Sequence, residues 1–119
     1  MRLLITGDRN WTDKQAISRC ISYLYSIGYD VLIHGAARGV DTIASEEAGR
    51  IGMTVVSYPA KWAQYHKAAG MIRNQQMLDD GKPDLVIWFH NNIDNSRGTK
   101  DMIARSKKQG ILTICYSMI

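Results

Sequence analysis

Short apolar runs alternate along the chain with segments whose apolar residues recur at helical spacing. The run at 84–89, for example, reads DLVIWF, which is typical of a strand covered on both faces of a sheet. Ile17, Cys20, Ile21 and Leu24 recur at the three- and four-residue spacing of one helix face. The pattern predicts strands at 2–6, 30–34, 53–58, 84–89 and 111–115. It predicts helices at 13–26, 40–50, 68–79 and 98–108, with an irregular stretch at 60–67 and a polar loop at 90–97.

This alternation predicts an α/β fold: one Rossmann-like domain with a five-stranded, mostly parallel sheet and helices on both faces. A chain of 119 residues suits a single domain over 1–119. The apolar run at the N-terminus is too short for a signal peptide, and no run is long enough to span a bilayer. We therefore expect a cytoplasmic protein.

The composition restricts the possible ligands and metal sites only moderately. The net charge of +4 and the pI of about 9.2 fit an anionic ligand without requiring a nucleic acid. Cys20 and Cys115 lie far apart in sequence and in no metal-ligand spacing, so we expect two reduced, buried thiols and no metal site.

Three loops that leave predicted strands contain both glycine and arginine. In open parallel sheets, ligands bind outside the carboxyl ends of the strands, and the helix N-termini that follow favour phosphate. The first of these loops offers Gly7 and Arg9 as ligand-binding residues.

The loop after the second strand offers Gly35, Arg38, Gly39 and Asp41. It matches neither the dinucleotide fingerprint nor a P-loop, so a tight turn with an exposed Arg38 is the alternative. Asp41 is interpreted either as a helix-start carboxylate or as an acceptor for a ribose hydroxyl.

The loop after the fourth strand ends in Ser96, Arg97, Gly98 and Thr99. Gly98 and Thr99 are predicted to present N–H groups and a hydroxyl to a phosphate, with Arg97 beside it. The alternative is that Ser96 is only a helix N-cap and Arg97 a solvated surface residue.

Other residues are less decisive. Trp62 and Tyr65 either stack on a base or pack their loop onto the domain or a partner chain. Arg73 lies in a predicted helix, where its spacing alone suits a solvated face. His34 ends an apolar strand and is interpreted as a core histidine rather than a catalyst.

Four linked motifs resemble the YspA-like branch of the SLOG superfamily, which joins the DNA-processing protein DprA/Smf with the LOG nucleotide hydrolases. The motifs are TGDRNWTD at 6–13, IHGAARGVD at 33–41, PAKW at 59–62 with AAGMIRNQQM at 68–77, and SRGTKDM at 96–102. They cover nearly the whole chain in order. The resemblance implies a Rossmann-like domain that binds nucleotides or nucleotide-derived signals.

The resemblance also implies candidate catalytic residues. LOG enzymes cleave the N-glycosidic bond of nucleoside 5′-monophosphates with an arginine in an R-K-x-x-M segment and a glutamate after a G-G-x-G-T loop. Arg73 and Met77 match that segment, with Asn74 in place of the lysine, and Asp101 falls near the place of the glutamate. Asn74 joins the predicted ligand-binding residues.

Three functions follow as expectations: a non-catalytic nucleotide-binding module, a nucleotide N-glycosidase, and a DprA-like binder of single-stranded DNA. The first is favoured. We expect no resident cofactor, no membrane partner and a homodimer or higher homo-oligomer. Small free-standing relatives resemble accessory proteins of bacteria and phages.

Overall fold

The computed structural model describes residues 1–119 and places five parallel strands in one sheet. The strands are β1 (Arg2–Gly7), β2 (Val31–His34), β3 (Thr54–Ser57), β4 (Leu85–Phe89) and β5 (Leu112–Cys115). The α-helices are α1 (Lys14–Ser26), α2 (Val40–Ile51), α3 (Trp62–Tyr65), α4 (Ala69–Asp79) and α5 (Arg97–Lys108). Short 3-10 helices are η1 (His66–Ala68), η2 (Ile93–Asn95) and η3 (Tyr116–Met118). None of the helices combines the length and the apolarity needed to cross a membrane.

The strand order is β3-β2-β1-β4-β5, so β1 lies at the centre of the sheet. Leu3 pairs with Leu32 of β2 and with Leu85 of β4. The order reverses between β1 and β4, whose ends Gly7 and Phe89 are partners. This is the switch point at which open α/β sheets bind ligands. The predicted fold class is therefore confirmed, and the sheet is wholly parallel.

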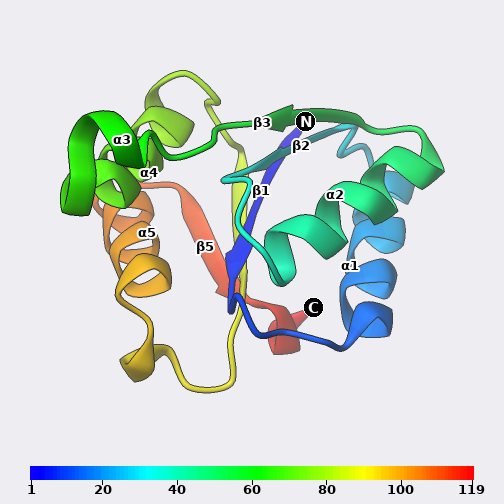
Figure 1. The fold of residues 1–119 in the computed structure, drawn as a ribbon. Helices are drawn as coiled ribbons and strands as arrows, with labels where there is room; N and C mark the ends of the chain where they lie inside the picture. The colour runs from blue at the N-terminus through cyan, green and yellow to red at the C-terminus, as the bar shows by residue number, and fades with distance from the viewer.

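Helices cover both faces of the sheet, with α1 and α2 on one side and α4 and α5 on the other (Figure 1). The core toward α1 and α2 contains 16 buried residues, including Leu3, Ile5 and Phe89. The core toward α4 and α5 contains only 6, among them Leu4, Met77 and Met102. Less apolar contact is therefore available between α4 and α5, and polar side chains fill part of that interface.

Helix ends follow local chemistry. Asp13 caps α1, since its side chain accepts the N–H of Ala16 at 3.2 Å. Gly52 ends α2 in the left-handed conformation, with φ of 96°. The predicted boundaries of these elements differ from the observed ones by one residue.

Three expectations need correction. The stretch at 60–67 is not wholly irregular, because it contains α3 and the start of η1. The loop at 90–97 contains η2, and its last residue already begins α5. Cys20 is buried as predicted, but Cys115 is only half-buried because β5 is an edge strand.

Candidate functional site

The glycine-containing loops meet at the carboxyl edge of the sheet. Asp8 links them: its N–H donates to the carbonyl of Phe89 at 2.9 Å, and its own carbonyl accepts the N–H of Val40 at 3.1 Å. A Cβ on Gly7 would lie 2.2 Å from the Phe89 oxygen, and one on Gly39 would lie 2.4 Å from the Asp8 oxygen. These two glycines therefore permit close packing of one loop on another. Their predicted contact with a ligand stays a prediction.

Arg9, Arg38 and Arg97 are exposed, and each follows the carboxyl end of a strand. Because the sheet is parallel, all three lie toward one edge, as a common anion site requires. The side chains of Arg9 and Arg38 make no hydrogen bond or ion pair within the chain. No residue of the chain fixes these two guanidinium groups in place.

Asp41 lies beneath the loop after β2 and is only 6% exposed. Its Oδ2 accepts the N–H groups of Gly35 at 3.1 Å and of Ala37 at 3.3 Å. Burial raises the pKa of this carboxyl to about 6, although these hydrogen bonds and the charge of Arg73 oppose the shift. The geometry shows Asp41 holding the loop from within, and the buried carboxylate presents little surface to a ribose.

Arg73 reaches the same loop from α4. Its Nη1 donates to the carbonyl of Gly35, and its Nε donates to Asn74 Oδ1 at 3.0 Å. Gly35 is thus held at both of its backbone groups, by Asp41 at its N–H and by Arg73 at its carbonyl. A guanidinium has five N–H donors, and two are used here, so three make no bond within the chain. Burial lowers the pKa of Arg73, and Asp41 partly offsets this.

His34 completes the surroundings of this loop. It is 5% exposed, and its Nδ1 accepts the N–H of Ala36 at 2.9 Å. Burial and the nearby Arg73 charge lower its pKa, which favours the neutral ring that such an acceptor requires. His34 therefore stabilises the backbone of this loop by accepting a hydrogen bond from it.

A cavity of about 170 Å³ opens beside Arg73. Its other lining residues are Pro59, Lys61, Tyr65, Ala69, Ile72 and Gln76. Trp62, on α3, is 58% exposed and borders Gly70 together with Arg73: a Cβ at Gly70 would lie 3.5 Å from the indole and 4.0 Å from Arg73 Nη2. Arg9, Arg38 and Arg97 line no part of this cavity. As exposed side chains, they lie at an open rim.

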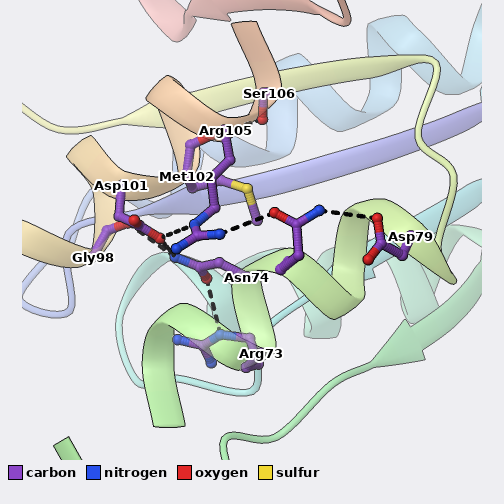
Figure 2. A network of polar contacts seen from close by, with 9 residues as sticks. Arg73, Asn74, Asp79, Gly98, Asp101, Met102, Arg105 and Ser106 are labelled. Atoms are coloured by element: carbon purple, nitrogen blue, oxygen red, sulfur yellow. Dashed lines mark hydrogen bonds and ion pairs between the residues drawn. The ribbon is translucent and has the colours of Figure 1, made fainter. Parts of the chain in front are cut away.

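A polar network joins α4 to α5 (Figure 2). Asn74 is 3% exposed; its Nδ2 donates to Asp101 Oδ2 at 3.0 Å and to the carbonyl of Gly98 at 3.3 Å. Arg105 Nε donates to the same Asp101 oxygen at 2.8 Å, and its Nη1 donates to Gln75 at 2.9 Å. Arg73 and Asp101, the predicted catalytic pair, are thus connected through Asn74 and not by a direct bond.

One of the free N–H groups at the start of α5 is already bonded to the residue that caps the helix. Ser96 is the N-cap, and its Oγ accepts the N–H of Thr99 at 3.1 Å. Thr99 is 2% exposed, so neither its N–H nor its side chain is presented to solvent. Gly98, by contrast, faces open space, since an added Cβ would meet no atom within 4 Å. Of this loop, Arg97 and Gly98 remain the accessible candidates.

Two members of the network, Arg105 and Gln75, were not predicted from the sequence. The i,i+4 spacing of Asp101 and Arg105 is the standard signal for a helical ion pair and could have identified the first. Gln75 has no comparable signal, because its bond to Arg105 crosses between two helices. No three His, Cys, Asp or Glu residues are grouped as a metal site would require.

These features define a class: a parallel Rossmann-like domain whose arginine- and glycine-containing loops gather at the switch point of the sheet. The chain belongs to the family described as YspA, cpYpsA-related SLOG family, which residues 1–65 match. It is also 32% identical over 122 residues to the Gene 61 protein of Mycobacterium phage D29, an alignment that covers 97% of this chain and 95% of the relative. The predicted family is confirmed. Membership in a SLOG family suggests nucleotide-related binding or hydrolase activity.

Proposed function

We propose that this chain binds a nucleotide or nucleotide-derived ligand at the carboxyl edge of the sheet, between Arg73 and the first turn of α5. The observation that carries the proposal is the state of Arg73: a half-buried guanidinium held by two acceptors, with three unused donors beside a cavity. A guanidinium held in this way is suited to a phosphate, because little further ordering is needed on binding.

The Asn74 amide sets an upper limit on the distance between Arg73 and the first turn of α5. Asn74 bonds both to Arg73 and to Gly98, and an amide oxygen and nitrogen are about 2.2 Å apart. The Arg73 Nε and the Gly98 carbonyl are therefore at most about 8.5 Å apart. The cap on Thr99 leaves the N–H groups of Arg97 and Gly98 at the open end of α5, where helix termini favour anions.

The remaining parts of the ligand need more surface. Pockets that enclose a drug-sized ligand measure about 300 Å³ or more, and the cavity beside Arg73 measures about 170 Å³. It therefore encloses only part of a nucleotide. The exposed Trp62 offers a face for a base, and we propose that a second copy of the chain covers the remainder, beside the exposed Met71 and Ile72.

Calorimetric titration with AMP, CMP, GMP and ADP-ribose tests the proposal. We expect saturable binding of at least one of these compounds, and a loss of at least about tenfold in affinity for Arg73→Ala. The matched control is Arg19→Ala, an exposed arginine on α1 whose only side-chain bond is to Gln15 at 3.4 Å. Equal affinities in the wild type and Arg73→Ala would refute the site.

A second candidate function is cleavage of the N-glycosidic bond of a nucleoside 5′-monophosphate. It is favoured by the single amide of Asn74, which holds Arg73 and Asp101 in one network. In this role Asp101 stabilises positive charge at the anomeric carbon while Arg73 binds the phosphate. Chromatography after incubation with AMP, CMP and GMP decides between the two functions. If the wild type releases free base and both Arg73→Ala and Asp101→Ala release none, the chain is an enzyme. If the nucleotide binds but stays unchanged, the chain is a binding module.

A further inference from the structure

Asn74 is the one side chain that bonds to both halves of the proposed site. Its Oδ1 accepts Arg73 Nε at 3.0 Å, and its Nδ2 donates to Asp101 at 3.0 Å and to Gly98 at 3.3 Å. Arg73 in turn holds Gly35, directly after β2, while Gly98 lies in the first turn of α5, the helix that follows β4. One amide therefore connects loops from either side of the central strand.

The orientation of this amide is fixed by its partners. Asp101 Oδ2 and the Gly98 carbonyl only accept, and Arg73 Nε only donates. Rotating the amide by half a turn would set its oxygen against two acceptors and its NH₂ group against a donor. Since Asn74 is 3% exposed, water cannot substitute for these partners.

We propose that Asn74 is a positioning residue: it fixes the plane of the Arg73 guanidinium and its distance from the first turn of α5, and so sets the affinity for a phosphate group. Its effect on affinity rests on the proposed nucleotide binding, whereas its effect on Arg73 does not. Without Asn74, Arg73 keeps only the bond to Gly35 and can turn about it, and the cost of ordering the guanidinium falls on the ligand.

Four variants separate positioning from ligand contact. Asn74→Leu removes both bonding functions of the amide. Asn74→Asp keeps an acceptor for Arg73 but sets a second carboxylate against Asp101. The doubly substituted chain, Asn74→Asp with Asp101→Asn, exchanges the two groups and restores one donor and one acceptor between positions 74 and 101. It does not restore the bond to Gly98, whose carbonyl then faces a carboxylate oxygen. The matched control is Gln75→Leu, which disturbs the same network at Arg105 and leaves the contacts of Arg73 intact.

The first measurement needs no ligand. In a ¹⁵N-labelled sample, the Arg73 Nε–H should give a resonance protected from exchange with water, assigned by its absence in Arg73→Lys. We expect that protection to be lost in Asn74→Leu and kept in Gln75→Leu. Protection that persists in Asn74→Leu would overturn the inference.

The second measurement is AMP titration of the same chains. We expect AMP affinity to fall by about tenfold in Asn74→Leu and Asn74→Asp, and to recover in part in the doubly substituted chain, which still lacks the bond to Gly98. Affinity that is lost while the Arg73 resonance stays protected would show that Asn74 contacts the ligand itself, which also overturns positioning. If Asn74→Leu does not fold, the comparison of Asn74→Asp with the doubly substituted chain still decides. If the wild-type chain binds no nucleotide, the proposed function is refuted. The resonance measurement alone then tests whether Asn74 positions Arg73.

Discussion

Asp41 should make this protein less stable as the pH rises through the weakly acidic range. Its carboxyl has a pKa of about 6 in the folded chain, compared with 3.8 for an ordinary aspartate, because burial disfavours the ionised form. Between these values the folded state binds more protons than the unfolded state, so the free energy of unfolding falls as the pH increases. The contribution of Asp41 is therefore present in full below about pH 4 and is lost above about pH 6.

The size of the effect follows from the shift. One pKa unit corresponds to about 1.4 kcal/mol, so ionising Asp41 should cost roughly 3 kcal/mol of folding free energy at neutral pH. Asn has the same shape, and its Oδ1 can still accept from Gly35 and Ala37, which now bond to Asp41 Oδ2. Asp41→Asn should therefore be more stable than the wild type at pH 8, by up to about that amount, and nearly equal to it at pH 4.

Urea unfolding at one-unit intervals from pH 4 to pH 8, at constant ionic strength, tests this expectation. The quantity of interest is the difference between wild type and Asp41→Asn at each pH, because this difference isolates the contribution of Asp41. Asp80→Asn is the control, because Asp80 is exposed and makes no side-chain bond within the chain, and its difference should stay flat. A difference for Asp41→Asn that is also flat, or that grows toward low pH, would refute the reasoning.

Three further substitutions or modifications test the structure around the site. Gly39→Ala should destabilise the chain by about 2 kcal/mol or more in urea unfolding, because φ is +74° and the new Cβ would lie 2.4 Å from a backbone oxygen. Gly98→Ala is the control: its new Cβ would have no atom within 4 Å, so the free energy of unfolding should change by less than about 1 kcal/mol. Ser96→Ala should cost about 1 kcal/mol in the same assay through loss of the α5 cap, and an unchanged value would argue against that cap. At pH 8 a thiol reagent should modify Cys115 quickly and Cys20 only after unfolding, because burial raises the pKa of Cys20 to about 12; rapid modification of two thiols in the native chain would contradict the core assignment.

The fold could be predicted from the sequence because its strongest signals are local and repeated. The apolar runs and the helical spacing of Ile17, Cys20, Ile21 and Leu24 are each enough to place an element, and their alternation indicates a parallel sheet, although it does not determine the strand order. Segment 60–67 was harder, since the two short helices there bury no residue and so leave no apolar pattern to find. Helix ends were correct to a residue where a cap residue such as Asp13 or Gly52 stood at the boundary.

The site was predictable only in part. That loops after parallel strands share an edge is a property of topology, and it places Arg9, Arg38 and Arg97 without any knowledge of side chains. The contact between Arg73 and Gly35 joins residues 38 positions apart, and no local sequence pattern predicts it. Helical spacing taken alone even favoured a solvated Arg73, because spacing does not show what packs against a helix.

The glycines and the arginines that the sequence pattern singled out have different roles in the structure. Gly7 and Gly39 are required by neighbouring backbone, since any Cβ there would overlap Phe89 or Asp8. The glycines therefore let the loops pack tightly, and Arg73 bonds to Gly35 in one of these loops. Rigidity achieved in the unliganded chain lowers the ordering cost of binding. In the proposed site an anion would use donors that the chain leaves unpaired, so the bonds that hold Arg73 matter to the proposal as much as its charge.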